Sequence, residues 1–431
     1  EKEITYQISH ASPKVMIVED AFVGKFENIK DQLSGIAAKV VSDTVANSAS
    51  ADWLRFSEVL ATHDRAEVDR TVSEDDIAML VYTSGTEAFP KGVMIPHRNY
   101  IMSTTPAWSY ALDIRMSDRW LFLMPFHTIA GLGSMTTLTQ IGATLVLAHT
   151  VDAPMAARVI SSDQVTIMAQ TPTFYLAMIA VEGFSTMDVS SLRRCLTYGG
   201  TVPKSMIDAW SVAAPEIVWG TYWGQSVLSQ LGSVGWFKTL EDIPNGDPSW
   251  IGKPVPQLEI RVVDDEGVDA AEGELICRSP SVMLGYLKDP EKTAETVKGG
   301  WLHTGDLGRI DIDNRLYLVD RKGDMIISGG YNIYPREIED VIAEIPEVLE
   351  VAVMGIHDVE WGQRVTAMVT LVPNTTVDHA ELTARILEHC KSRMASYKKP
   401  KDLRIVAEFP LNSTGKIAKK VLKQQLEAEG K

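Results

Sequence analysis

"RWLFLMPF", residues 119–126, decides the fold class, because it is a short apolar run that a proline closes. Three similar runs follow, each ended by glycine, proline or a polar residue: "GATLVLAH" (142–149), "VTIMAQTP" (165–172) and "RRCLTYGG" (193–200). Stretches with helical spacing separate them, such as "DAPMAARVISSDQ" (152–164) and "PKSMIDAWSVAAP" (203–215). Short buried strands that alternate with helices predict a largely parallel α/β sheet.

The sequence pattern changes from about residue 250. Segments such as "QLEIRVVDDEG" (257–267) and "GELICRSP" (273–280) alternate apolar and polar residues and end in turns, which is typical of antiparallel strands. After Gly323 the pattern reads helix, strands, helix as far as residue 394, which predicts a small α+β unit. We therefore expect a domain boundary between residues 321 and 322.

Composition and charge exclude several classes of protein. The chain has 431 residues, 45% of them apolar, and a net charge of −16, which disfavours nucleic-acid binding. Its three cysteines, Cys195, Cys277 and Cys390, are far apart and show no CxxC spacing, so neither a zinc site nor a disulfide framework is indicated. The sequence offers no membrane-spanning apolar run and no signal peptide at its start, so we expect a soluble cytoplasmic protein.

"YTSGTEAFPKGV" (82–93) is a loop rich in serine, threonine and glycine that follows an apolar run. Its hydroxyls and backbone N–H groups can point at anionic oxygens, while Gly85 and Gly92 permit tight turns and Lys91 adds a positive charge. It is not a Walker A loop, because Pro90 stands where the second glycine would be. From these letters alone, a phosphate-binding loop and an ordinary surface turn both stay open.

Five further motifs follow in order: "YGGTVP" (198–203), "TYWGQS" (221–226), "WLHTGDLG" (301–308), "DRKGDMIISGGYNIYPREIE" (320–339) and "PLNSTGKI" (410–417). With the loop at 82–93, this ordered set resembles the acyl-adenylate-forming family of acyl-CoA synthetases, peptide-synthetase adenylation domains and beetle luciferases. The resemblance covers residues 1 to about 426. It implies a large α/β domain with parallel sheets and a small β-barrel-like subdomain (1–321), and a small mobile α+β lid domain (322–431).

The resemblance implies a two-step reaction with ATP, Mg²⁺ and coenzyme A. A carboxylate attacks the α-phosphate of ATP to give acyl-AMP and pyrophosphate, and a thiol then displaces AMP. The residues that the resemblance assigns to ATP or coenzyme A are Thr83, Ser84, Gly85, Thr86, Lys91, Gly199, Gly200, Thr201, Tyr222, Trp223, Gly224, Asp306, Arg321, Ser328, Gly329 and Gly330. In this assignment Trp223 stacks on adenine, Asp306 accepts the ribose hydroxyls with Arg321 beside it, and the loop from Thr83 to Lys91 embraces the β- and γ-phosphates.

Three residues receive catalytic roles from the resemblance. Lys416 would bridge the reacting carboxylate and the α-phosphate, Ser226 stands at the family's threonine position near that phosphate, and His127 would gate the acid pocket. Taken one at a time, each residue also has a purely structural interpretation. Asp306 could be a turn residue, Lys416 could lie on the solvated surface, and His127 could be a core histidine with its hydrogen bonds satisfied. The ordered set of motifs favours the functional roles.

The acid itself is left open. Expected pocket neighbours are Gln170, Gly200, Gly224 and Ser229. No aspartate is evident at the family's amino-acid-binding position, which favours an aliphatic or aryl acid over an α-amino acid. By the same resemblance, "SGGYN" (328–332) lines the pantetheine tunnel and Gly323 stands at the hinge of the lid. The basic run "YKKPKD" (397–402) fits either a solvated face or a contact with the phosphates of coenzyme A.

The sequence departs from the family pattern at three places. Ala88 replaces a frequent glycine of the phosphate loop, which is a mild change. Val227 replaces the glutamate that normally helps to hold magnesium on ATP, and valine cannot bind a hard cation. No metal-ligating residue of this chain is therefore predicted. The chain also begins at a point that usually lies about 100 residues into the family, so either the sequence is truncated or a partner covers the surface. A chain that is truly so short is expected to expose apolar sheet area and to be unstable or oligomeric, for example a homodimer.

The leading prediction is an ATP-dependent acid–CoA ligase. One rival has the same fold but transfers the acyl group to a carrier protein or an amine, or performs mainly one half-reaction because of Val227. The second rival is a catalytically silent protein that binds a nucleotide or acyl-AMP without turnover. Acid-dependent release of pyrophosphate would separate the second rival from the enzymes.

Overall fold

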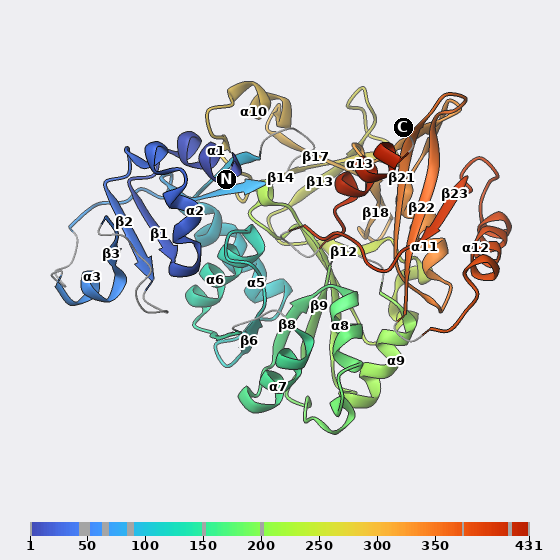
Figure 1. The fold of residues 1–431 in the computed structure, drawn as a ribbon, viewed down its shortest axis with the longest axis horizontal. Helices are drawn as coiled ribbons and strands as arrows, with labels where there is room; N and C mark the ends of the chain where they lie inside the picture. Colours follow the sequence, from blue (N-terminus) through green and yellow to red (C-terminus); the bar gives the residue numbers. More distant parts are fainter. Residues whose placement is uncertain are drawn as a thin grey trace. The chain divides into compact units, whose positions relative to one another are not determined.

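The structure is a computed structural model that describes residues 2–42, 52–62, 69–83, 90–148, 152–198, 202–372, 375–412 and 416–429. The chain divides into two compact units. The first consists of Glu1–His97 and Leu284–Thr293, and the second of Arg98–Met283 and Ala294–Lys431. Figure 1 follows the elements of both units along the chain.

The first unit contains two small sheets. One is parallel, and its strands are β1 (Val15–Glu19), β2 (Ala38–Ser42) and β3 (Leu54–Arg55). The helices around it are α1 (Lys2–Ala11), α2 (Val23–Glu27) and α3 (Phe56–Thr62). The other sheet is antiparallel and consists of β4 (Ile77–Thr83), β5 (Lys91–Pro96) and β15 (Gly285–Tyr286). The phosphate-loop sequence therefore connects the two strands of a hairpin, β4 and β5.

The second unit is built on a 12-stranded sheet, and the first half of this sheet is parallel. Its parallel strands are β6 (Arg119–Phe122), β7 (Thr144–Leu147), β8 (Ile167–Gln170), β9 (Arg194–Thr197) and β10 (Val218–Trp223). The helices between them are α6 (Ile129–Ile141), α7 (Ala153–Asp163), α8 (Pro172–Ile179) and α9 (Lys204–Ala213). The predicted alternation of short strands and helices is confirmed, because each apolar run ends at the punctuation that the sequence shows.

The second half of the same sheet is antiparallel, as the alternating pattern after residue 250 predicts. Its strands are β11 (Ser233–Phe237), β12 (Trp250–Pro254), β13 (Glu259–Val263), β14 (Glu272–Arg278), β16 (Val297–Lys298), β17 (Trp301–Ile310) and β18 (Leu316–Arg321). Helix α10 (Pro290–Thr296) precedes β16 in the chain. Because β11 pairs with β10, the parallel and antiparallel halves form one continuous sheet.

The chain leaves this sheet at Arg321 and enters a five-stranded sheet at Ile326. The strands of that sheet are β19 (Ile326–Ser328), β20 (Tyr331–Ile333), β21 (Val348–Asp358), β22 (Gly362–Leu371) and β23 (Asp402–Ile405). Its helices are α11 (Pro335–Ala343), α12 (His379–Arg393) and α13 (Lys419–Glu429). Ile338, Ile342, Leu382 and Ile386 belong to a separate buried core. This change of sheet is consistent with the boundary at 321/322, which stays a prediction.

A core of large aromatic side chains supports the parallel strands. Figure 1 shows α8 beside β9 and α9 beside α8. Tyr175 of α8 and Trp210 of α9 meet Trp219 of β10 with ring centroids 5.0–5.9 Å apart. All three are at most 2% exposed. The Tyr175 hydroxyl lies 3.1 Å from the carbonyl oxygen of Leu196, and the Trp210 indole donates to the carbonyl of Tyr175.

Within the described residues, no helix is long and apolar enough to cross a membrane.

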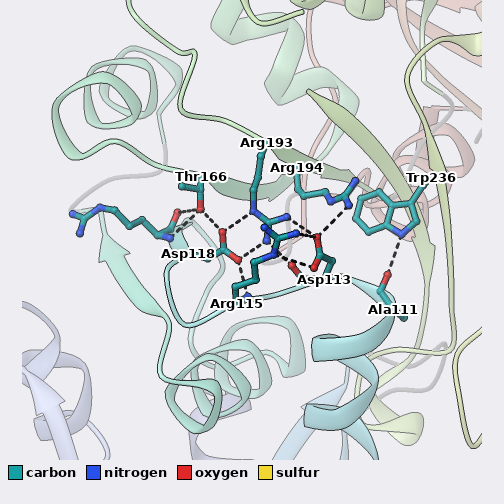
Figure 2. Close-up of polar contacts among 9 residues, drawn as sticks. Ala111, Asp113, Arg115, Asp118, Thr166, Arg193, Arg194 and Trp236 are labelled. Carbon is teal, nitrogen blue, oxygen red and sulfur yellow. Dashed lines mark hydrogen bonds and ion pairs between the residues drawn. The ribbon is translucent and has the colours of Figure 1, made fainter. Parts of the chain in front are cut away.

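A network of charged side chains joins the amino ends of β6 and β9, at the edge opposite their carboxyl ends (Figure 2). Asp118 is 2% exposed and accepts hydrogen bonds from Arg193 at 2.5 and 2.8 Å and from the Thr166 hydroxyl at 2.8 Å. Arg193 and Arg194 also pair with Asp113, at 3.1 and 3.3 Å. Burial alone would raise the pKa of Asp118, but the hydrogen bonds from Arg193 and Thr166 lower it below its ordinary value.

Replacing Arg193 with methionine should lower the free energy of unfolding at pH 7 by about 3 kcal/mol, because Asp118 would keep a buried charge without its partner. The pKa of Asp118 is lower in the folded state than the ordinary value of 3.8. The stability that the charged carboxylate contributes is therefore present above pH 3.8 and is lost as the pH falls through the pKa of the folded state. The difference between variant and parent should therefore shrink in acid. Urea unfolding of both proteins at several pH values measures this difference in the free energy of unfolding. Arg115→Ala, at a side chain that is 60% exposed, should lower the free energy of unfolding much less than the Arg193 substitution does.

Candidate functional site

The sheet gathers several predicted site segments at one edge. Strands β6, β8, β9 and β10 are parallel, so their carboxyl ends lie at the same edge of the sheet. Gln170 ends β8, and the segments that follow β6, β9 and β10 carry His127, Tyr198 and Ser226. In open α/β sheets, ligands bind outside the carboxyl ends of the strands. This edge is therefore the candidate site.

Asp306 is the centre of a polar cluster beside that edge. It lies on β17, is 2% exposed, and its Oδ2 accepts from Trp223 Nε1 at 2.7 Å and from Gln225 Nε2 at 2.6 Å. Arg321, its cross-strand partner on β18, places Nε 3.2 Å from Oδ1. A carboxylate oxygen can accept about two hydrogen bonds. Oδ2 therefore has two protein donors, whereas Arg321 is the one partner of Oδ1 among the described residues.

The Trp223 indole is held from two sides in this cluster. Its N–H donates to Asp306, and its six-membered ring packs on Gly232, where an added Cβ would lie 2.3 Å from Cζ3. Only a glycine fits at that position, and Trp223 is 6% exposed. Stacking of adenine on Trp223 stays a prediction, and only a small part of the ring is open to it in this structure.

Lys416 belongs electrostatically to the same cluster. Lys416 is an exposed residue, but protein atoms crowd its ammonium, and this desolvation lowers its pKa. The Arg321 guanidinium lowers the pKa further, and the Asp306 carboxylate acts in the opposite direction. The N–H of Asn412 donates to the carbonyl of Lys416 at 2.8 Å, and the N–H of Lys416 donates to Asn412 Oδ1 at 3.0 Å, which fixes the segment. Asp306 and Arg321 are thus in direct contact, and Lys416 is close enough for both charges to act on its pKa; the resemblance assigned all three residues to the site.

Tyr222 lies apart from this cluster. Successive side chains of a strand point to opposite faces, so Tyr222 and Trp223 of β10 cannot line the same face. The Tyr222 ring instead lies 5.6 Å from the Tyr198 ring, and the Tyr198 hydroxyl contacts the sulfur of Met124 at 3.1 Å. Burial raises the pKa of Tyr222 well above its ordinary value. Tyr222 is therefore close to the segment that carries His127.

The turn after β10 is fixed by close backbone contacts. An added Cβ at Gly224 would lie 1.5 Å from the carbonyl oxygen of Gln230, so only glycine fits there. Ser226 begins a short 3₁₀ helix (Ser226–Leu228) and is half-buried. Val227 is 9% exposed, and its carbonyl accepts the N–H of Met283 at 2.9 Å. This turn fixes the backbone of Ser226 and Val227 close to the end of β10, where Trp223 lies.

The predicted acid-pocket residues have different environments. His127 is exposed and precedes Thr128, whose hydroxyl caps α6 by accepting the N–H of Gly131. Gln170 is 7% exposed, and its amide oxygen accepts the N–H of the following residue at 3.2 Å. Ser229 is completely buried. Its hydroxyl accepts a hydrogen bond from the Asn99 amide at 2.8 Å and donates one to the carbonyl of Ser281 at 2.7 Å. A supporting role behind the pocket suits Ser229 better than direct contact with a ligand.

The remaining predicted residues lie in other parts of the chain. Thr83 and Lys91 face each other as partners of the β4–β5 hairpin, and the Lys91 ammonium lies 5.6 Å from the centre of the Tyr286 ring. Ser328 ends β19, and the glycines Gly329 and Gly330 that follow it have φ values of +58° and +83°. The predicted residues Ser84, Gly85, Thr86, Ala88, Gly199, Gly200 and Thr201 lie outside the described residues.

Gln225 is a site residue that the sequence analysis did not select. Its amide donates to Asp306 and also to the carbonyl of Thr304 at 2.9 Å. The available signal was its spacing, because a residue two positions after Trp223 in extended chain points to the same face. Thr304 supports the cluster as well, since its hydroxyl accepts the N–H of Asp306 at 3.1 Å.

The side chains that the structure describes do not fit a preformed magnesium site. Among them, no group of three or more His, Cys, Asp or Glu side chains is arranged to hold a metal ion. Val227 offers no oxygen at the position where the family has glutamate. Magnesium commonly keeps water and substrate phosphates as ligands. An ion that accompanies ATP would therefore depend on those ligands.

Comparison with family models gives two matches. Residues 1–287 match the model described as AMP-binding enzyme, and residues 337–416 match the AMP-binding enzyme C-terminal domain. Long-chain-fatty-acid–CoA ligase FadD13 of Mycobacterium tuberculosis is 32% identical over 428 residues, which cover 99% of this chain and 81% of that protein. The 2-succinylbenzoate–CoA ligase of Bacillus cereus is 33% identical over 376 residues, 86% of this chain and 75% of that protein.

A solved structure agrees with these sequence matches. The anthranilate CoA ligase AuaEII, crystallised in complex with anthranoyl-AMP, superposes with a TM-score of 0.87 at 29% identity. The alignment covers the whole of this chain and 81% of that structure. The fold predicted from the ordered motifs is thereby confirmed.

Proposed function

Because this chain belongs to the AMP-binding enzyme family, we propose that it is an ATP-dependent acid–CoA ligase. It would activate a carboxylic acid as acyl-AMP and transfer the acyl group to coenzyme A. The named relatives support this assignment, since both are CoA ligases. The acid is proposed to be aliphatic or aryl, in keeping with the lack of an evident amino-acid-binding aspartate.

The grouping of Asp306, Arg321 and Lys416 carries the proposal. Asp306 keeps an acceptor position on Oδ1 for a ribose hydroxyl, and Arg321, 62% exposed, can reach the same sugar. Lys416 places a positive charge near both residues. Such a charge stabilises the negative charge that develops when a carboxylate attacks the α-phosphate and pyrophosphate leaves. The cluster thus holds the nucleotide and assists the same step.

Acid-dependent pyrophosphate release tests this function. The assay uses ATP, magnesium and a panel of fatty and aryl acids, with and without coenzyme A. A ligase should release pyrophosphate with at least one acid and form the corresponding acyl-CoA when coenzyme A is present. Release without acyl-CoA would favour another acceptor, such as a carrier protein or an amine. Nucleotide binding without release under any acid would contradict the proposal.

Lys91→Ala should raise the KM for ATP by about 10-fold and leave the KM for the acid nearly unchanged, since one charge contact to phosphate contributes of the order of 1.4 kcal/mol. The proposal behind this expectation is that the β4–β5 hairpin holds the phosphates of ATP. Steady-state kinetics with each substrate varied in turn measures both constants. Lys288→Ala is the control, because the Lys288 ammonium donates to the carbonyl of His10 instead. Equal increases in both KM values for Lys91→Ala would contradict the phosphate role.

Two further properties stay proposals. A reducing compartment such as the cytoplasm is supported by Cys195, Cys277 and Cys390, all free and buried. A homodimer is supported by the apolar side chains Val15 and Ile17 of β1, which are 56% and 63% exposed. Light scattering of the purified protein would measure its oligomeric state.

A further inference from the structure

Asp320 is a buried carboxylate that joins the two sheets of the second unit. It is the residue before Arg321 on β18 and is 7% exposed. Its Oδ1 accepts the N–H of Arg321 at 2.6 Å, and its Oδ2 accepts the N–H of Arg336 at 2.9 Å. Arg336 is the second residue of α11. One side chain therefore fixes the end of the large sheet to the first helix of the five-stranded sheet.

Helix α11 depends on this outside partner at its amino end. The first N–H groups of a helix have no partner within the helix and are commonly satisfied by a capping side chain. Tyr334, at the N-cap position, provides no side-chain cap, and Pro335 has no N–H to donate. Asp320 fills this role from another strand, and its negative charge is favourable at the positive end of the helix dipole.

The segment that carries Lys416 is anchored to the same helix. Lys419, three residues after Lys416, pairs with Glu339 of α11 at 2.6 Å. Glu339 also accepts the N–H of Val353 on β21 at 2.7 Å, which fixes its position. Arg336 and Glu339 are three residues apart and so lie on the same side of α11. Burial would lower the pKa of Lys419, but the charges of Glu339, Asp324 and Asp320 raise it overall.

We propose that Asp320 is a positioning residue for the first half-reaction. By holding the amino end of α11 against β18, it keeps Lys416, through Lys419, beside Asp306 and Arg321. Asp320 acts through these residues and not on the substrate itself. The inference rests on the proposed ligase function, because it assigns Lys416 to the step in which acyl-AMP forms.

The test compares Asp320→Asn with Asp311→Asn. Asparagine keeps one acceptor oxygen and turns an NH₂ group toward the other N–H, so one of the two hydrogen bonds is lost. Asp311 is a matched control at the far end of the same hairpin, where it accepts the N–H groups of Asp313 and Arg315. Both variants and the parent are assayed for acid-dependent pyrophosphate–ATP exchange, and for acyl transfer from preformed acyl-AMP to coenzyme A.

Asp320→Asn should slow pyrophosphate exchange by about 10-fold while acyl transfer changes less than about 2-fold. Asp311→Asn should leave the ratio of the two rates at the parent value. This ratio does not depend on the fraction of folded protein. Equal losses in both half-reactions of Asp320→Asn, or no loss in either, would overturn the positioning role. A parent protein that exchanges no pyrophosphate with any acid would instead contradict the ligase function.

Hydrogen exchange supplies a second measurement that needs no substrate. The amide of Arg336 should exchange about 10-fold faster in Asp320→Ala than in the parent, because alanine removes both acceptor oxygens, and it should be unchanged in Asp311→Ala. Unchanged protection of Arg336 in Asp320→Ala would show that the carboxylate does not hold the helix, and the inference would fail whatever the activity.

Discussion

Lys416→Ala should lower the rate of acid-dependent pyrophosphate release by roughly 10²- to 10³-fold, the loss typical of removing one group that stabilises transition-state charge. Lys416 shares its electrostatic environment with Asp306 and Arg321, the residues that we propose bind the nucleotide. Acyl transfer from preformed acyl-AMP to coenzyme A should fall much less, since the phosphoryl bond is already formed. Rapid-quench measurement of both half-reactions gives the two effects separately.

The pH profile distinguishes a catalytic charge from a structural lysine. The ammonium is the charged form, and burial followed by the Arg321 charge lowers its pKa. The charge is therefore lost at a lower pH than the ordinary value of 10.5, and pyrophosphate release should fall on the alkaline side below that value. Lys416→Ala should lack this alkaline limb, and Lys420→Ala, an exposed control on α13, should retain it. If Lys416→Ala keeps the same alkaline decrease in rate as the parent, that decrease belongs to another titrating group.

Local sequence pattern was sufficient for the framework of the fold. The run at 119–126 became β6, and the alternating segments after residue 250 became antiparallel strands, because burial on one or two faces directly determines apolar spacing. Parallel pairing then places the ends of β8 and β9 at one edge. The site residues at that edge were assigned by the resemblance of the ordered motifs and not by this apolar pattern.

Contacts between distant segments were not predictable in this way. The indole N–H of Trp223 meets Asp306, 83 positions later, and periodicity carries no information about such a pair. Arg193 was read only as the start of a strand, although it neutralises the buried Asp118. The cap that Asp320 gives to α11 also depends on how two sheets meet. Such pairs follow from tertiary packing and need a structure.

Val227→Glu should raise acid-dependent pyrophosphate release by roughly 10²-fold, because a carboxylate near the triphosphate can supply an oxygen ligand to magnesium, and metal charge stabilisation amounts to several kcal/mol. The backbone at Val227 is held by the N–H of Met283 at 2.9 Å, so the exchange changes the side chain and leaves the turn in place. Initial rates measured over a magnesium titration should show the gain together with a lower magnesium requirement.

Val227→Gln separates charge from size in this experiment. Glutamine has nearly the volume of glutamate but no negative charge, so it should bring little gain in pyrophosphate release. Thermal melts of both variants check that the substitution at a site only 9% exposed leaves the protein folded. Equal rates for the parent and a folded Val227→Glu variant would show that valine at this position does not limit the ATP step. A gain confined to Val227→Glu would show that the fold can bind ATP productively and that this one residue slows its use.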